Sequence, residues 1–278
     1  MEHFGRPFRK MSKALSPKPL ERSPRRLLKL VNVLLDVGRE ATRNVCWGAV
    51  DSFQYGRSAE TIIMDGLKAM TPATSFWGKC LGYFRTEVKP SAGTWIVDLL
   101  FRLDDAIRGW PIWGSVMCLV QEDCVTLSAI DLPSIDERLL ASNGRTYLKR
   151  YGGHCERLPL LQPSNVKARD CVVAASASMK KSTTEVCALA LLRLEINRMV
   201  QDFGLNAISL LVQGKIDAVI ECGLPTQTIA SITPILQGVG CVVTDWEGRN
   251  TCCSNRIIAA RSRSLSNELV SIVGHHSR

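Results

Sequence analysis

Apolar and polar positions along the chain alternate with two different periods. Near the start, the spacing of apolar residues predicts an amphipathic helix from Arg25 to about Cys46, with a stripe of Leu27, Leu28, Val31, Leu34, Leu35 and Val37. Later, short β-rich runs between turn residues predict strands at Thr94–Val97, Ser115–Val120, Val125–Ile130, Asp170–Ala175 and Ala218–Glu221. Further helices are predicted at Ala59–Met70, Thr183–Val200, Ala207–Val212 and Thr228–Val239. The predicted order is two helices, then a meander of strands, then helices that alternate with strands. This order indicates an α+β or layered α/β fold with mixed sheets.

The first 24 residues differ from the rest of the chain. They contain four prolines among Arg, Lys and Ser, so they cannot sustain a helix and have little apolar surface to bury. We expect a disordered basic arm at residues 1–24. It is interpreted as a solvated tail, an organelle-targeting segment or a contact for an anionic partner; Glu2, Glu21 and the prolines count against targeting.

Composition indicates a globular protein with a large core, because 46% of the 278 residues are hydrophobic and 22% are charged. No apolar run reaches the roughly 18 to 20 residues needed to span a bilayer, and we expect a cytoplasmic protein. The net charge is +9, but residues 1–29 contribute +7 of it. The rest of the chain therefore carries a net charge of only +2. Nucleic-acid-binding domains spread Lys and Arg over one face of the fold, so this distribution argues against such a domain.

The eleven cysteines form no C-x-x-C pair, and the four histidines do not combine with them at zinc-finger spacing. We interpret them as reduced thiols in apolar surroundings. The acidic residues are more informative. Asp98 ends the predicted strand that starts at Trp95, and strand-end carboxylates are where open sheets place ligands. Taken alone, Asp98 would be interpreted as no more than an ordinary turn or helix-capping residue.

Several motifs together resemble the inositol monophosphatase superfamily, in wording nearest to its histidinol-phosphatase branch. The family stretch W-[IV]-[IVL]-D-P-I-D-G-T matches Trp95–Leu103 in part, and Gly109-x-Pro111 with Trp113-Gly114 follows. The family run G-x-[IV]-T-D-W-x-G resembles part of the stretch Pro234–Arg249, in which Thr244–Gly248 is the most specific signal. The resemblance implies a layered α-β-α-β-α sandwich at residues 25–278, with two closely packed lobes at about 25–150 and 151–278.

The resemblance also implies a Mg²⁺ site that this chain has largely lost. Family enzymes hydrolyse phosphate monoesters with Mg²⁺ held by Glu and Asp carboxylates. At the matching positions this chain keeps Asp98 but has replaced the other residues of the signature, by Lys79, Cys80, Phe101, Arg102, Leu103 and Thr228. Glu221 matches a position that touches substrate hydroxyls. We expect Asp98, Lys79 and Thr228 to share one cleft.

Alternatives remain open for this site. In one alternative, a remodelled loop places Asp104 or Asp105 where the family has its second Asp. In the other, Lys79 and Arg102 form an anion-binding site without metal. A motif at Arg150–Cys155 resembles a histidinol-phosphatase sequence but is displaced along the chain, and we interpret it as an ordinary turn.

Two functions follow from these alternatives. The first is a catalytically impaired family member, a pseudoenzyme with an anion-binding or scaffold role. The second is an active Mg²⁺-dependent phosphatase acting on a small hydroxylated phosphate such as histidinol phosphate or an inositol phosphate. The resemblance further implies a homodimer.

Overall fold

The computed structural model describes residues 24–43, 52–88, 92–102, 110, 112–175, 182–249 and 254–274. The chain divides between Glu156 and Arg157 into two compact units, here called the N-terminal and the C-terminal unit. Residues 1–23 of the predicted basic arm lie outside the described residues. No helix in the described ranges combines the length and the apolar character needed to cross a lipid bilayer.

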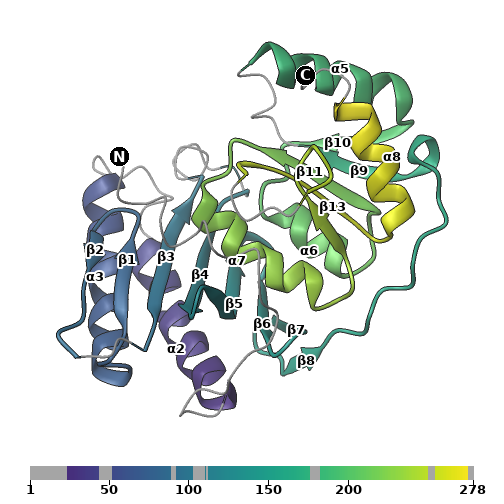
Figure 1. The fold of residues 1–278 in the computed structure, drawn as a ribbon. Coiled ribbons are helices and arrows are strands. Elements are labelled where there is room, and N and C mark those ends of the chain that lie inside the picture. The colour runs from purple at the N-terminus through teal and green to yellow at the C-terminus, as the bar shows by residue number, and fades with distance from the viewer. Residues whose placement is uncertain are drawn as a thin grey trace. The chain divides into compact units, whose positions relative to one another are not determined.

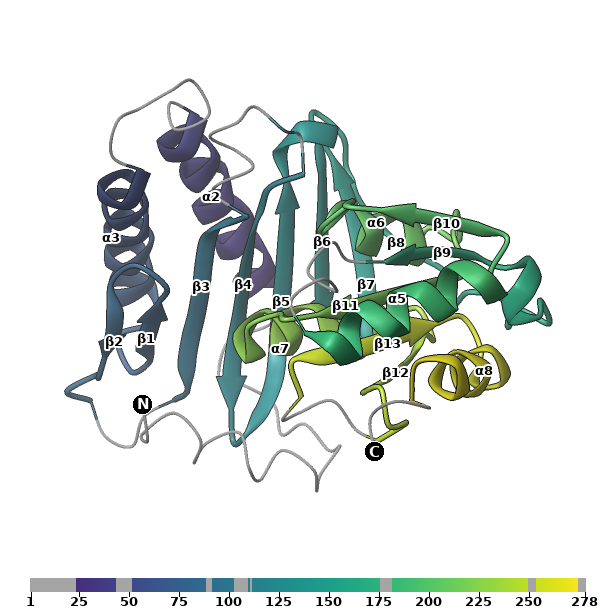
Figure 2. The same cartoon turned by 90° about the horizontal axis from the view of Figure 1, so that it is seen from above.

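The N-terminal unit is built on a mixed sheet with two helices, α2 (Pro24–Arg43) and α3 (Ser52–Met70), which Figure 1 colours purple and blue. The strand order is β2-β1-β3-β4-β5-β6-β7-β8. The strands are β1 (Ser75–Gly78), β2 (Gly82–Phe84), β3 (Thr94–Phe101), β4 (Gly114–Gln121), β5 (Cys124–Leu132), β6 (Glu137–Ser142), β7 (Arg145–Arg150) and β8 (Cys155–Arg157). Figure 2 shows the longer strands side by side. β1 pairs with β3 in parallel, and the pairs from β3 to β7 are antiparallel.

The apolar stripes of α2 and α3 pack on one face of this sheet. Leu35 and Ile63 belong to the same buried cluster as Trp95, Met117 and Leu127. The indole of Trp95 is fully buried, and its Nε1 donates to Thr71 Oγ1 at 3.1 Å. The family-like tryptophan therefore fills the core and ties β3 to the residue that follows α3.

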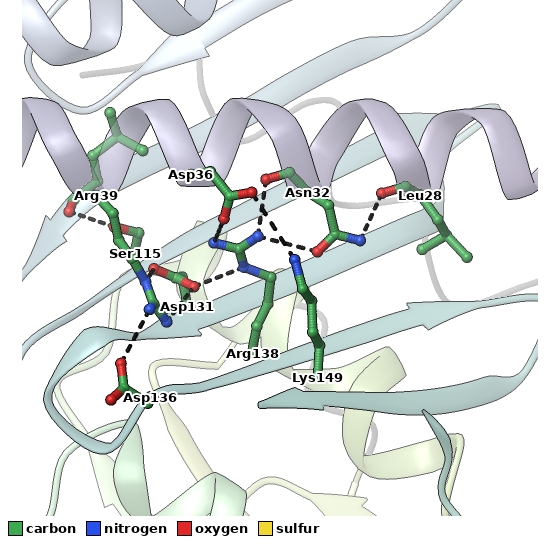
Figure 3. Close-up of polar contacts among 10 residues, drawn as sticks. Leu28, Asn32, Asp36, Arg39, Ser115, Asp131, Asp136, Arg138 and Lys149 are labelled. Atoms are coloured by element: carbon green, nitrogen blue, oxygen red, sulfur yellow. Dashed lines mark hydrogen bonds and ion pairs between the residues drawn. The ribbon is translucent and has the colours of Figure 1, made fainter. Parts of the chain in front are cut away.

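A buried polar cluster joins α2 to β5 and β6 (Figure 3). Oδ1 of Asp131 accepts from Arg138 Nε at 2.7 Å and from Arg39 Nη2 at 3.1 Å, and Oδ2 accepts from Arg39 Nε at 2.7 Å. Arg138 also donates to the carbonyl oxygen of Asn32 and pairs with Asp36. Two guanidinium groups thus compensate one buried carboxylate and hold the helix at a fixed register on the sheet.

The C-terminal unit has a five-stranded sheet with helices on both faces, coloured teal to yellow in Figure 1. The strand order is β10-β9-β11-β13-β12, and β11 runs parallel to β9 but antiparallel to β13. The strands are β9 (Val172–Ala175), β10 (Arg198–Gln201), β11 (Ala218–Cys222), β12 (Val242–Thr244) and β13 (Arg256–Ala260). The helices are α5 (Thr183–Glu195), α6 (Asn206–Val212), α7 (Thr226–Gln237) and α8 (Arg263–Gly274).

One face of this second sheet packs on α5 and α8. Its even-numbered β11 and β13 residues, such as Ile220 and Ile258, share a buried cluster with Leu189 of α5 and Leu269 of α8. Because side chains alternate along a strand, the odd-numbered residues face α6 and α7. Helix α5 begins with a capping box, in which Ser182 Oγ accepts from Glu185 N and the Glu185 carboxylate accepts from Ser182 N.

The structure confirms the α+β class and corrects several predicted boundaries. α3 begins at Ser52, seven residues before the predicted Ala59, and α2 ends at Arg43. The helix predicted at Thr183–Val200 ends at Glu195, because the chain turns extended at Ile196 and pairs as β10 with β9. The sequence pattern did not predict the strands β1, β2, β6, β7, β8, β10 and β12. Residues 151–153 form a turn, with Gly152 at a φ of 70°, as expected for the displaced Arg150–Cys155 motif.

Candidate functional site

Asp98 lies inside β3, not at its end as predicted. The strand continues to Phe101, and its pairing with β4 shifts register between Asp98 and Phe101. Such a bulge re-aims side chains and is common near functional sites. Asp98 is only 4% exposed, and its Oδ1 accepts from the backbone N–H of Leu100 at 3.2 Å. Burial raises the pKa of Asp98, while neighbouring Lys79 acts in the opposite direction.

Lys79 lies in the tight turn between β1 and β2 and points its ammonium at Asp98. The distance from Nζ is 3.0 Å to Oδ2 and 3.3 Å to Oδ1, and Nζ also donates to the carbonyl oxygen of Leu100 at 3.3 Å. The structure therefore brings two of the predicted residues together as an ion pair. The positive charge next to the Asp98 carboxylate is the ammonium group of Lys79.

Glu60 supports the turn that carries Lys79, and sequence reasoning did not identify it. Its Oε2 accepts from the backbone N–H groups of Cys80 and Leu81, both at 2.9 Å. Burial raises the pKa of Glu60 to about 7 against these two hydrogen bonds. The pKa of the Cys80 thiol is raised to about 11, first by burial and then by the charges of Glu60 and Asp98. Cys80 is therefore a neutral thiol and a poor metal ligand at neutral pH.

One sequence signal could have found Glu60. On α3 it lies on the same helical stripe as Ile63, Met64 and Leu67, which are all buried. A charged residue on an apolar stripe must have its hydrogen bonds satisfied inside the protein. The backbone N–H groups of a tight turn satisfy it here.

The residues that follow Asp98 carry no carboxylate into the described part of the site. Phe101 is 7% exposed and packs as a core residue, and Arg102 has a φ of 60°. The family motif has glycine at the position of Arg102, and glycine adopts positive φ without strain. Arg102 thus adopts a backbone conformation that favours glycine. Leu103, Asp104 and Asp105 lie outside the described residues.

The C-terminal unit holds the other two predicted residues. Glu221 is 8% exposed near the end of β11, on the face toward α6 and α7. Thr228 lies in the first turn of α7, is 1% exposed, and its Oγ1 has no hydrogen-bond partner among the described residues. Asp98 and Lys79 belong to the N-terminal unit, so the predicted shared cleft with Thr228 stays a prediction.

The Thr244–Gly248 motif has a structural role. Oδ1 of Asp245 accepts from the N–H groups of Glu247 and Arg249, at 2.9 and 2.8 Å, and Oδ2 accepts from Arg249 Nε at 3.0 Å. Trp246 is fully buried against the α5–α8 face, and Gly248 has a φ of 79°. The motif closes a tight turn and fixes a core tryptophan.

These residues do not fit a Mg²⁺ site of the family type. Mg²⁺ takes near-octahedral oxygen ligands, in proteins one or two carboxylates together with waters and substrate phosphates. A neighbouring ammonium repels the ion. Within the described ranges, no group of three or more His, Cys, Asp or Glu side chains could hold a metal ion. Asp98 already shares its oxygens with Lys79 and Leu100. A cation would have to displace the Lys79 ammonium.

Comparison with known proteins identifies the relatives of this chain. The model of the inositol monophosphatase family matches residues 48–278. Over 184 residues the chain is 25% identical to "Bifunctional phosphatase IMPL2, chloroplastic" of Arabidopsis thaliana; the match covers 64% of this chain and about half, 49%, of the plant protein. It is 20% identical to the histidinol-phosphatase of Chlorobaculum parvum, over 80% of this chain and 83% of that protein.

Solved structures show the same fold. An inositol monophosphatase from Zymomonas mobilis superposes with a TM-score of 0.77 at 20% identity, over 91% of this chain and all of that chain. The extragenic suppressor protein suhB from Bartonella henselae gives a TM-score of 0.75 at 20% identity, over 90% and 99% of the two chains. At these identities the likeness concerns the fold.

Proposed function

The chain belongs to the inositol monophosphatase family, and on this premise we propose that it is a catalytically impaired member that keeps the fold for binding. The observation that carries the proposal is the ion pair between Lys79 Nζ and Asp98 Oδ2, at 3.0 Å. It puts a tethered monovalent cation next to the carboxylate that the family motif would offer to Mg²⁺. An ammonium can neutralise Asp98, but it cannot polarise a water molecule as a divalent metal does.

The remaining replacements support the same conclusion. Phe101 is apolar and buried where the motif has its second Asp, and Thr228 presents a hydroxyl where the motif has the helix-opening Asp. A family-type mechanism needs several carboxylates at once, because one ion must activate water while another stabilises the leaving oxygen. The loss of three of them removes the ligands of that arrangement together.

The binding role is proposed for a small anion in the cytoplasm. Lys79 remains 43% exposed although its partner Asp98 is buried, so an oxyanion can reach the ammonium from solvent. Arg102 would add a second cation. A homodimer, as the family resemblance implies, is part of this proposal.

The test is a phosphomonoesterase assay with p-nitrophenyl phosphate and Mg²⁺, together with a calorimetric Mg²⁺ titration. We expect neither turnover nor saturable Mg²⁺ binding by the unmodified protein. The variants are Asp98→Asn and, as a matched control, Asp65→Asn, which neutralises an exposed carboxylate on α3. Mg²⁺-dependent turnover that Asp98→Asn abolishes and Asp65→Asn preserves would overturn the proposal. It would establish an active phosphatase, and assays with histidinol phosphate and inositol phosphates would then test the alternative substrate class.

A further inference from the structure

A polar pocket of about 470 Å³ opens in the C-terminal unit beside the start of α7. Pockets that hold small ligands have volumes of about 300 to 1,000 Å³, so this one is large enough for a small metabolite. Thr226 of α7, Asn255 and Arg256 contribute to its wall, together with the turn of Asp245, Glu247 and Arg249. None of these residues is a replaced position of the family's metal signature.

The side chain of Arg256 lies on the opposite face of the sheet from Glu221. Arg256 pairs with Cys222 in the β11–β13 ladder, and Glu221 pairs with Ile257. Cys222 and Ile258 pack in the cluster formed with α5 and α8. Since side chains alternate along a strand, Arg256 extends toward the α5–α8 face, and Glu221 points to the other face.

The two carboxylates of the pocket share one guanidinium, that of Arg249, within their own turn. Asp245 accepts two backbone N–H groups and the Nε of Arg249. Glu247 Oε2 accepts from Arg249 Nη2 at 2.9 Å. These contacts hold Arg249 and the turn in place. Arg256 supplies the second guanidinium of the wall, on the side away from this turn's own ion pairs.

Arg256 is poorly paired for a guanidinium that is mostly covered. Its side chain is 27% exposed, and its ion-pair contact is Nη2 to Glu185 Oε1 at 3.6 Å. Its buried Nε has no hydrogen-bond partner among the described residues, and neither has the Nε1 of Trp246, whose ring lies 5.2 Å from the guanidinium carbon. Buried donors without acceptors cost free energy. Both atoms are sealed from solvent, so a ligand in the pocket meets the exposed part of the Arg256 side chain.

We propose that this pocket binds the oxyanion group, phosphate or carboxylate, of a small metabolite, with Arg256 as the main contact. An oxyanion supplies acceptors in the geometry that a guanidinium fork recognises, and it compensates a charge that Glu185 meets only at long range. The face of Trp246 fixes the orientation of the guanidinium. The side chains of Thr226 and Asn255 offer hydroxyl and amide groups to the rest of the ligand. This site is independent of the function proposed for the Lys79–Asp98 pair.

The test follows the indole N–H signals of the full-length protein by ¹H–¹⁵N NMR. The chain has six tryptophans, so the spectrum is simple, and a Trp246→Phe variant assigns the relevant signal. Inorganic phosphate and acetate are titrated separately, each against sodium chloride of equal ionic strength. We expect a saturable shift of the Trp246 signal with one or both anions and not with chloride, and the arm with the higher affinity identifies the class of oxyanion.

Variants connect that shift to Arg256. Arg256→Met should weaken binding about tenfold or more, because a charge-assisted hydrogen bond is lost. Arg198→Met, which removes an exposed guanidinium from β10 of the same unit, should leave the affinity unchanged. If Arg256→Met does not fold, Arg256→Lys replaces it and should still bind several-fold more weakly, since lysine lacks the planar fork. The absence of a saturable shift with either anion, or unchanged affinity in the Arg256 variant, would overturn the proposal.

Discussion

Lys79 and Asp98 form an ion pair in which one partner is half exposed and the other is buried. The side chain of Lys79 is 43% exposed and that of Asp98 is 5% exposed, with Nζ and Oδ2 at 3.0 Å. Burial favours the neutral form of Asp98 and raises its pKa, whereas the ammonium stabilises the ionised form. The ionised form of this carboxyl group is therefore stabilised mainly by one half-exposed lysine, with a further hydrogen bond from the backbone N–H of Leu100.

Removing that lysine should destabilise the protein at neutral pH. Lys79→Met leaves a buried carboxylate without its counter-charge, and we expect a loss of about 1 to 2 kcal/mol at pH 7, reduced by the partial exposure of the ammonium. A carboxyl group with a raised folded-state pKa costs stability when ionised. The loss should therefore shrink as the pH falls and Asp98 takes up a proton. Urea unfolding between pH 4.5 and 8 measures it.

The matched control for this prediction is Lys29→Met, which removes an exposed ammonium from α2 in the same unit. Its unfolding free energy should change by less than about 0.5 kcal/mol. The double variant Lys79→Met with Asp98→Asn should recover part of the loss, because the buried charge is gone. Equal stabilities of the Lys79 and Lys29 variants would show that the ion pair contributes nothing.

The raised pKa of Glu60 predicts that the free energy of unfolding depends on pH in a range above that of an ordinary carboxyl group. Its pKa is raised from 4.5 to about 7, mainly by burial, so the folded protein holds this proton more tightly than the unfolded chain does. The resulting stability is fully present below about pH 4.5 and is lost as the pH rises to about 7. In Glu60→Gln this loss is absent, so relative to the unmodified protein the variant should gain about 2 to 3 kcal/mol between pH 4.5 and 8.

Glu87→Gln is the control for Glu60→Gln, because Glu87 is an exposed carboxylate of the same unit. Its difference from the unmodified protein should stay constant over this pH range. Parallel stability curves for the unmodified protein and Glu60→Gln would show that Glu60 has an ordinary pKa.

The elements of this fold were predictable wherever a single period dominates the sequence. The stripe around Leu34 predicted α2, and the apolar run from Trp95 predicted β3. Boundaries failed where long-range pairing decides the conformation. Val200 continues an apolar pattern after α5 but lies in β10, because its backbone pairs with Ala174 of β9. No local signal in the sequence shows that partner.

The sequence identified two residues of the candidate site, but it did not predict how they are arranged. The resemblance identified Lys79 and Asp98, 19 residues apart, and β1 pairs with β3 in parallel and so brings them together. It did not show that Asp98 lies within the strand, since the register shift before Phe101 depends on the pairing with β4. The role of the Asp245 turn also became clear only from its hydrogen bonds.

Arg102 offers a test of the inherited backbone conformation. Its φ of 60° is strained for a residue with a Cβ atom, and the family motif has glycine there. Arg102→Gly should stabilise the protein by up to about 1 kcal/mol, because the relief of strain exceeds the added entropy of the unfolded chain. Arg102→Ala removes the same contacts of the side chain but keeps the Cβ atom, so it should lack this gain. Thermal unfolding of both variants makes the comparison, and a lower stability of the glycine variant than of the alanine variant would contradict it.

Two aspartates that contact Arg39 separate the effect of burial from that of ion pairing. Asp131 is 1% exposed and binds both Arg39 and Arg138, whereas Asp136 is 67% exposed and lies 3.3 Å from Arg39 Nη1. Asp131→Asn leaves two largely covered guanidinium groups without their shared carboxylate, and we expect a loss of about 3 kcal/mol or more in urea unfolding. Asp136→Asn makes the same chemical change at the surface, where ion pairs contribute about 0 to 1 kcal/mol. Because asparagine tolerates the φ of 52° at position 136, backbone strain does not confound this control. If the two variants lose similar amounts of unfolding free energy, burial does not make the contacts of Asp131 more stabilising than a surface ion pair.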